Sequence, residues 1–169
     1  MTKFPRPLRR LDLIYPPKPI YFVTCCTFRR RAILANMRVH TAFVNFAESA
    51  QTNFAIAVGR YVILPDHLHL FVTGMPGLSL GKWVGALKRF LAKAVGPTNS
   101  QDPVWQRGFF DHVLRSAESY SQKWDYICEN PVRAGLVTNA SEWPFAGEIV
   151  TISHNRSLIG LLFLRDTDC

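Results

Sequence analysis

The sequence predicts an α+β fold in which an antiparallel sheet carries helices packed on one face. Segments with the patterns of strands and helices alternate in the order strand, helix, strand, strand, helix. A tight turn at Pro65–Asp66 joins the second and third strands directly, and so short a connection requires antiparallel pairing. The chain has 169 residues, of which 48% are apolar, so it suits one compact domain with a real core.

The first half of the chain contains three expected strands and one expected helix. Tyr21–Phe28 is rich in β-branched and aromatic residues, which predicts a strand. Ile56–Leu64, interrupted by Gly59, and His67–Thr73 predict the two strands of the hairpin. Between the first two strands, residues 36–53 carry apolar side chains four, three and four positions apart, which is the period of a helix: Val39, Phe43, Phe46 and Ala50.

The second half of the chain contains two further expected helices. Leu80–Ala94 is amphipathic, with a continuous apolar stripe. Val104–Leu114 is mixed in composition and is expected to be extended. Ala117–Asn130 predicts a third helix, which should end or restart at Pro131, because proline restricts the residue before it. The buried stripe of this third helix should consist of Tyr120, Trp124 and Ile127.

Three regions follow from these patterns. Residues 1–19 are basic and rich in proline, which predicts an arm without helix. Residues 20–147 contain all the expected elements and form the folded domain. Residues 148–169 are expected to be a C-terminal tail.

The charge balance of the chain is strongly basic. Lys and Arg number 20 against 12 Asp and Glu, which gives a formal net charge of +8. Such a balance favours polyanionic partners, nucleic acid above all, although an ordinary basic domain is the alternative. No apolar run is long enough for a membrane span, and the N-terminus lacks the apolar core of a secretory signal. The four cysteines have no CxxC spacing, so a reducing cytoplasm is the expected compartment.

The most specific local pattern is His67-Leu68-His69 on an expected strand. Side chains alternate along a strand, so both histidines should point to one face and the leucines to the other. The leucine face should pack against the helices, which leaves the histidines on the open face. Two neighbouring neutral imidazoles can bind one divalent metal ion, and a third ligand would come from elsewhere. Surface or hydrogen-bonded histidines are the alternative.

Tyr126 lies away from the buried stripe of the third helix. At roughly 100° per residue, its direction differs by about 120° from the centre of that stripe. Asn130 follows one turn later on the same side of the helix. An amphipathic surface tyrosine is one interpretation. The functional interpretation is a nucleophilic phenol with a metal ligand one turn further on, which needs an electrophile activated by a metal ion.

Several basic side chains are candidates for contact with phosphates. Three of them lie on one face of the expected helix over 80–94, which contains no acidic residue, although a solvated helix face is the alternative. Two others flank the aromatic pair Phe109-Phe110, where base stacking could accompany phosphate contacts. One more lies just after the expected helix over 117–130. In chain order the candidates are Lys82, Arg89, Lys93, Arg107, Arg115 and Arg133.

Four segments together resemble the REP-associated tyrosine transposases, a branch of the HUH single-tyrosine transposases. The HUH motif is histidine, bulky hydrophobe, histidine, as in His67-Leu68-His69. The likeness runs from about residue 18 to 147. The segments that carry it are Tyr61–His69, Val104–Arg115, Tyr126–Val137 and Glu142–Phe145.

This resemblance implies a ferredoxin-like α+β core with a catalytic role for residues 20–147. It implies a nuclease that uses Mg²⁺ or Mn²⁺ to cleave and rejoin single-stranded DNA, folded as a hairpin from repeated extragenic palindromes. By position, His67 and His69 match the metal-binding pair and Asn130 the third ligand. Tyr126 matches the nucleophile that forms a 5′-phosphotyrosine during DNA transposition. Asp66 stands where the family often has asparagine.

The sequence leaves other functions and states open. The same fold could serve as a non-catalytic regulator or relic that binds hairpin DNA. A phosphoesterase that uses water would need a second HxT or HxS motif, which the chain lacks. The resemblance allows a monomer or a homodimer, and DNA binding implies association with the nucleoid.

Overall fold

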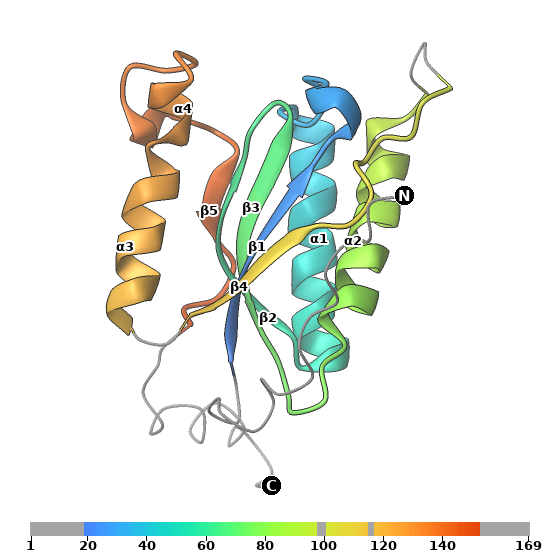
Figure 1. Ribbon diagram of the computed structural model, residues 1–169, viewed down its shortest axis with the longest axis vertical. Coiled ribbons are helices and arrows are strands. Elements are labelled where there is room, and N and C mark those ends of the chain that lie inside the picture. The colour runs from blue at the N-terminus through green and yellow to red at the C-terminus, as the bar shows by residue number, and fades with distance from the viewer. Residues whose placement is uncertain (1–18, 98–100, 115–116, 153–169) are drawn as a thin grey trace, which may run out of the picture.

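The computed structural model describes residues 19–97, 101–114 and 117–152 (Figure 1). Its five-stranded sheet has the strand order β4-β1-β3-β2-β5, and every neighbouring pair is antiparallel. The first four strands and the two intervening helices have the ferredoxin-like βαββαβ order, and β5 adds an edge strand. The strands are β1 (Ile20–Cys26), β2 (Ala57–Ile63), β3 (His67–Thr73), β4 (Phe110–Leu114) and β5 (Ala146–Glu148). The prediction of an antiparallel α+β fold is therefore confirmed.

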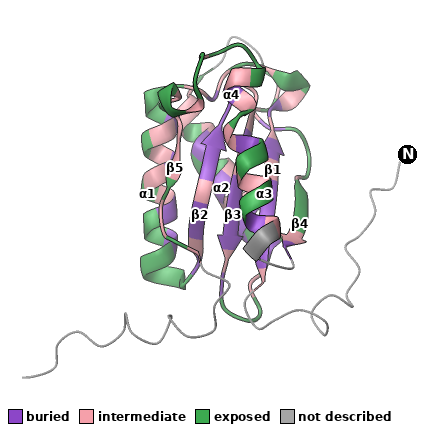
Figure 2. Cartoon of the chain, turned by 90° about the vertical axis from the view of Figure 1, so that its left-hand side faces the viewer, coloured by how far each residue is buried: buried purple, intermediate pink, exposed green. Residues whose placement is uncertain are grey.

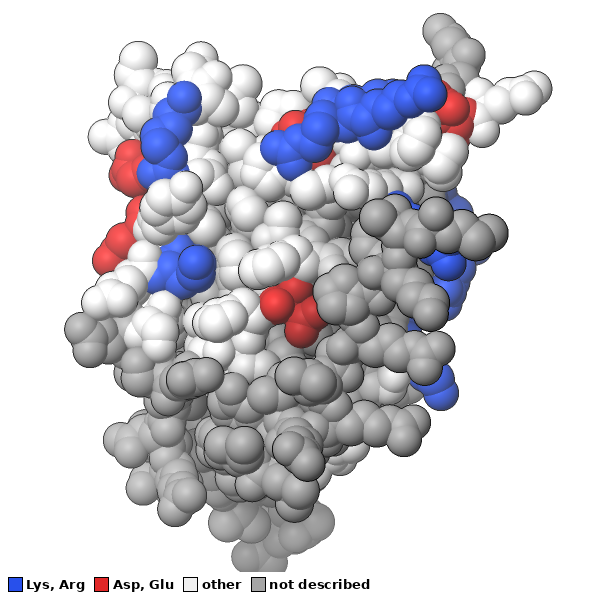
Figure 3. Space-filling view, viewed as in Figure 1, with Lys and Arg blue, Asp and Glu red and all other residues white. Residues whose placement is uncertain are grey.

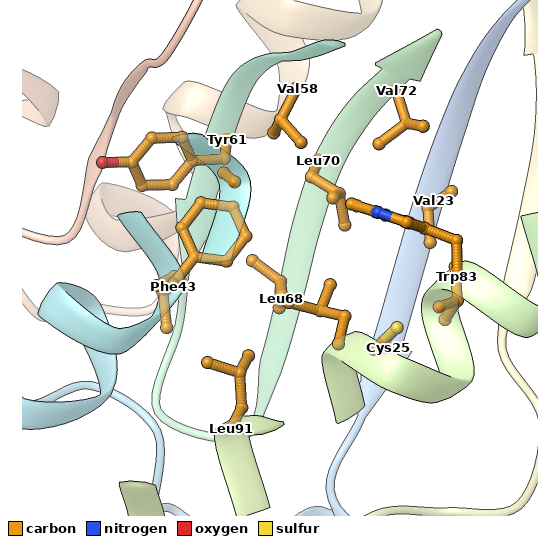
Figure 4. Close-up of a cluster of buried hydrophobic side chains, with 14 of the residues drawn as sticks. Val23, Cys25, Phe43, Val58, Tyr61, Leu68, Leu70, Val72, Trp83 and Leu91 are labelled. Carbon is orange, nitrogen blue, oxygen red and sulfur yellow. The ribbon is translucent and has the colours of Figure 1, made fainter. Parts of the chain in front are cut away.

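Two long helices, α1 (Met37–Phe54) and α2 (Leu80–Val95), cover one face of the sheet (Figure 1). The main core lies between these helices and the sheet. Figure 4 shows Leu68, Leu70 and Val72 of β3 within this core, and each is at most 1% exposed. The alternation predicted for β3 is confirmed, because the leucine face is buried against the helices.

The third long helix, α3 (Ala117–Cys128), lies on the opposite face of the sheet (Figure 2). This differs from the expectation that all helices share one face and that the histidine face is open. The reason is that the histidine face also carries aromatic side chains, Phe22 and Phe71. The ring centroid of Tyr120 lies 4.4 Å from that of Phe71, so α3 buries a second apolar cluster. Tyr120 and Ile127 are buried and Trp124 is half-buried, which confirms the predicted stripe.

The β2–β3 hairpin contains a β-bulge, where the register shifts between Val58 and Tyr61. Gly59 lies at this bulge, as the predicted interruption of the strand suggested. A side-chain carbon at Gly59 would lie 2.8 Å from Cδ1 of Ile152 and 3.0 Å from the hydroxyl oxygen of Tyr120. Glycine therefore allows α3 and the segment after β5 to approach the sheet.

Several helices and strands begin or end at other residues than the sequence predicts. β1 ends at Cys26, and a 3-10 turn, η2 (Phe28–Arg30), leads into α1. Only the end of the expected extended segment 104–114 belongs to the sheet, as β4. The helix restart predicted at Pro131 is confirmed, because α3 ends at Cys128 and a short helix, α4 (Asn130–Arg133), follows.

The C-terminal part of the described chain returns to the sheet. A second 3-10 turn, η3 (Ala140–Glu142), leads into β5. β5 straddles the predicted domain boundary at 147, and backbone N–H groups of Ile149 and Val150 donate to β2. Most of the expected arm and tail, residues 1–18 and 153–169, lies outside the described residues.

Candidate active site

The two histidines lie side by side at the beginning of β3. Their ring centroids are 4.7 Å apart and the ring planes are nearly perpendicular, at 86°. Both rings lie on the face covered by α3, because His69 stacks on Phe22 with a centroid distance of 5.4 Å. Both histidines are half-buried. The prediction that they share one face of the sheet is confirmed.

Each imidazole is held by a hydrogen bond at Nδ1. Nδ1 of His67 lies 2.6 Å from Oδ1 of Asp66, and Nδ1 of His69 lies 2.8 Å from Oγ1 of Thr24, its cross-strand partner on β1. When Nδ1 carries the proton in both rings, the lone pair of Nε2 is free to bind a metal ion. Asp66 and Thr24 therefore orient the two rings, and the carboxylate of Asp66, which can only accept, selects for His67 the tautomer that a metal ion needs.

A strained turn between β1 and α1 supports this arrangement. Arg29 and Arg30 have φ values of 54° and 55°, the left-handed region that non-glycine residues rarely adopt. In this conformation, Nε of Arg30 lies 2.7 Å from Oδ2 of Asp66. Thr27, just before this turn, joins it to the β2–β3 turn, because its N–H and hydroxyl both donate to the carbonyl oxygen of Asp66. Arg30 thus holds the carboxylate that orients His67.

The electrostatics of the site favour neutral histidines. Burial lowers the pKa of His69 to about 3, and the charges of Arg30 and Lys123 act in the same direction. Burial also lowers the pKa of His67, although Asp66 opposes the shift. Lys123 of α3 contributes because its ammonium group lies 5.2 Å from the ring centroid of Phe22, beside His69. Neutral imidazole is the form that coordinates metal ions.

Tyr126 and Asn130 form a second group with Arg133. Tyr126 is 63% exposed, so the prediction that it lies outside the core is confirmed. The guanidinium of Arg133 stacks over this ring, 4.3 Å from its centroid. The same guanidinium donates to the backbone carbonyl oxygen of Tyr126 and to Oδ1 of Asn130. Arg133 therefore links the phenol to the amide one helical turn later.

The two groups lie at the same end of the molecule. Figure 1 shows α4 at the end where the β2–β3 turn brings the chain into β3. Within the described residues, no cluster of three or more His, Cys, Asp or Glu side chains is arranged to hold a metal ion. Of the predicted ligands, the histidine pair offers two imidazole nitrogens, and Asn130 offers an amide oxygen that also accepts from Arg133. Both are ligand types that divalent cations accept in proteins.

The candidate phosphate contacts are distributed over several surfaces. Five of them are exposed: Lys82, Arg89 and Lys93 on α2, Arg107 before β4, and Arg133 on α4. The sixth, Arg115, lies outside the described residues. On one side of the molecule, cationic side chains gather along the end that carries the β2–β3 turn and beside α3 (Figure 3). Of the aromatic pair, Phe109 packs against the core and Phe110 is 62% exposed.

Sequence reasoning missed three residues of this site: Thr24, Arg30 and Lys123. Thr24 reaches His69 only through the register of β1 on β3, and Arg30 reaches Asp66 only through the left-handed turn. The alternation of β1 could have shown that Thr24 shares a face with Phe22 and Cys26, but not that this face meets the histidines. Lys123 had a weak signal, since it lies one turn before Tyr126.

Comparison with known proteins identifies the family of the chain. A family model described as "Transposase IS200 like" matches residues 18–130. The chain belongs to this family. A REP-associated tyrosine transposase of Escherichia coli (strain K12) is 34% identical over 91 residues, which is 53% of this chain and 52% of that protein. The matched region thus spans about half the length of that relative.

A second relative and a solved structure extend the similarity. An uncharacterized protein of Haemophilus influenzae is 23% identical over 158 residues, 75% of this chain and 88% of that protein. The solved structure is a REP-associated tyrosine transposase bound to a REP hairpin, with a TM-score of 0.66 and 25% identity. This match covers 86% of this chain and 82% of the solved chain. Among the described residues, no helix is both long and apolar enough to cross a membrane.

Proposed function

We propose that this family member is a metal-dependent endonuclease and strand transferase that acts on single-stranded DNA folded as a hairpin. The observation that carries the proposal is the pair of histidines fixed at Nδ1, with an exposed tyrosine at the same end of the molecule. Two oriented imidazoles and a free phenol are the groups that a nucleophilic attack on a metal-bound phosphodiester requires. DNA transposition is the process that this chemistry serves.

The reaction uses Tyr126 as the nucleophile. Its phenolic oxygen attacks the scissile phosphorus, forms a new P–O bond and releases its proton to water. The bond from phosphorus to the 3′ oxygen breaks, and the departing oxygen takes up a proton to become a free 3′-hydroxyl. The phosphate remains on Tyr126 as a 5′-phosphotyrosine, which a second 3′-hydroxyl can attack to rejoin the DNA. Arg133 holds the phenol ring in place through its stacked guanidinium.

The residues that would hold a cofactor are His67, His69 and Asn130. Mg²⁺ or Mn²⁺ bound to these side chains would supply Lewis-acid polarisation of the scissile phosphate. Asp66 and Thr24 keep the imidazoles oriented toward that position, and Arg30 keeps Asp66 in place.

The proposed partner is a hairpin from repeated extragenic palindromes. Support comes from the similar structure that was solved with a REP hairpin, and from the net charge of +8. The exposed cations on α2 and near α4 would contact its phosphates. The protein would act as a monomer or homodimer in the cytoplasm, on DNA of the nucleoid.

The test is a denaturing gel of the full chain with labelled hairpin DNA taken from repeats that flank the gene. Mn²⁺ or Mg²⁺ should produce a slower protein–DNA band, and EDTA should remove it. Binding in a native gel without a covalent band under any metal would contradict the enzyme and leave a hairpin-binding regulator. A cleaved strand without a covalent band would instead indicate a water nucleophile.

The cationic face of α2 should contribute to affinity in a salt-dependent way. Replacing Lys82, Arg89 and Lys93 by glutamine should flatten the slope of log K against log salt by about 0.7 to 0.9 for each phosphate that the helix no longer neutralises. The slope is measured by fluorescence anisotropy at several salt concentrations. An unchanged slope would show that this face is only solvated.

The contact between Asp66 and His67 should matter for metal binding. The Asp66→Ala variant loses both the group that accepts from Nδ1 and the ion pair with Arg30, so Mn²⁺ affinity should fall by roughly 10- to 100-fold. Calorimetric titration with Mn²⁺ alone measures this directly. Asp102→Ala is the matched control, because Asp102 also pairs with a neighbouring arginine but lies outside the site. Equal affinity of both variants for Mn²⁺ would contradict the role of Asp66.

A further inference from the structure

An open groove lies between α2 and the loop that leads into β4. Its volume is about 520 Å³, within the range of small-ligand sites. Gly81, Gly85 and Arg89 line it from α2, and Trp105 and Phe109 line it from the loop. Figure 1 shows this loop running alongside α2 on the side of the sheet away from α3. The groove is thus separate from the histidine pair and from Tyr126.

The floor of the groove consists of two helical glycines that the packing does not require. A side-chain carbon at Gly81 would meet no atom within 4 Å, and one at Gly85 would meet only Nη1 of Arg89, at 3.5 Å. Glycine weakens a helix interior relative to alanine, so these positions reduce the stability of α2 without a packing reason. What the two glycines do provide is an open, flat surface beneath the groove.

The loop that forms the opposite wall is fixed in place by Lys88. Its ammonium group donates to the carbonyl oxygens of Gln106 and Gly108, each at 2.7 Å. In return, the indole N–H of Trp105 donates to the carbonyl oxygen of Lys88, also at 2.7 Å. The wall therefore exists before any ligand binds, so little ordering of the loop is needed on binding.

The groove combines apolar walls with a cationic rim. Arg89 lines it, and the exposed Lys82 and Lys93 lie on the same helix, which carries no acidic residue. Asp102, near the loop, is paired with Arg29 at 3.8 Å. A flat aromatic ligand with an attached anion matches this combination, and a nucleotide has both parts.

The groove is also connected to the candidate active site. The N–H of Phe28 donates to the carbonyl oxygen of Val104, and the N–H of Gln106 donates to that of Cys26. The groove loop is therefore bonded to the turn that carries Arg30, which in turn holds Asp66 beside His67.

We propose that the groove binds an unpaired nucleotide of the DNA substrate, with the base against Phe109 over the glycine floor and a phosphate on Arg89. This inference rests on the proposed function, since it assumes that DNA is the substrate. It adds a site for a base outside the hairpin stem, away from the reacting phosphate. Contacts of this kind bind single-stranded flanks through stacking.

The test compares two arms attached to the same hairpin in anisotropy measurements. One arm is single-stranded with normal bases, and the other has abasic sites at the same phosphates. The wild-type chain should prefer the normal arm by about fivefold to a hundredfold, the range expected for one stacked base. The Gly81→Leu, Gly85→Leu double variant fills the groove and should lose this preference. Its melting temperature should not fall, because leucine favours a helix over glycine.

The control is Asn45→Leu, which adds the same side chain to an exposed position of α1 and should keep the preference. If the groove variant still preferred the arm with normal bases as strongly as the wild type does, the proposed nucleotide site would be wrong. The proposed function would stand as long as that variant formed the covalent band. A wild-type chain that binds neither arm would overturn both. A groove variant that cannot distinguish the arms but still forms the covalent band would support the groove and place it outside the chemistry.

Discussion

The Tyr126→Phe variant is expected to form no covalent protein–DNA band, with the cleavage rate reduced by about 10⁴-fold or more. The substitution removes only the oxygen that would attack phosphorus. The ring remains, and with it the surface on which Arg133 stacks. Because Tyr126 is exposed and outside both apolar clusters, the variant should fold and bind the hairpin as the wild type does.

The matched control for this variant lies on the same helix. Tyr120→Phe also removes one hydroxyl, but this hydroxyl is buried near Gly59 and accepts from the N–H of Arg60 at 3.4 Å. That variant should lose about 1 kcal/mol of unfolding free energy and keep the covalent band. If Tyr126→Phe formed the band at the wild-type level, the assigned nucleophile would be wrong. If both variants lost it, the defect would lie in folding rather than chemistry.

Local patterns in the sequence were sufficient for most elements of the fold. The alternation of Leu68 and Leu70 with His67 and His69 identified the buried face of β3, because a strand with one buried face has a strong period of two. The short turn at Pro65–Asp66 fixed the hairpin. Helical spacing identified α1, α2 and α3 because each buries one stripe of apolar side chains.

What the sequence did not reveal depends on contacts between distant segments. Placing α3 required the knowledge that Phe22 and Phe71 meet on neighbouring strands and form an apolar surface beside His69. The segment before β4 has strand-like residues, yet Lys88 of α2 binds two of its carbonyl groups. Trp105 still forms an isolated antiparallel bridge with Thr27, but these carbonyls bind the helix, so the regular strand begins only at Phe110.

The candidate site also contains residues that the sequence identified and residues that only the structure shows. His67, His69, Tyr126 and Asn130 could be chosen from motif and helical spacing, because those relations lie within one element or one turn. Asp66 was also visible, as the acidic neighbour of His67, and the structure adds its hydrogen bond to Nδ1. The supporting residues on β1 and in the turn after it could not be chosen. Thr24 acts through a hydrogen bond at Nδ1 of His69, and Arg30 acts through a backbone conformation that non-glycine residues rarely adopt. Such supporting contacts depend on the register of β1 and on a turn stabilised from two sides.

The burial of His69 should make the protein sensitive to acid even when no metal ion is bound. In the unfolded chain this imidazole takes up a proton as the pH falls below its ordinary pKa of 6.5, whereas in the folded chain it does so only near a pKa of about 3. Between these values the unfolded state binds more protons, so the free energy of unfolding decreases as the pH falls. Above pH 6.5 the His69 imidazole is neutral in both states and costs no stability. By about pH 4 the free energy of unfolding should have fallen by on the order of 3 kcal/mol.

Urea unfolding at a series of pH values, with EDTA present, measures this loss. His69→Gln carries no titrating group at this position, so its unfolding free energy should depend less steeply on pH between 6.5 and 4. His112→Gln is the matched control, because His112 is exposed on β4 and its replacement should leave the wild-type slope. Parallel curves for wild type and His69→Gln would show that the imidazole is solvated in the folded protein. A flatter curve for His69→Gln alone would show that the sheet and α3 keep it neutral, the state in which it can bind a metal ion.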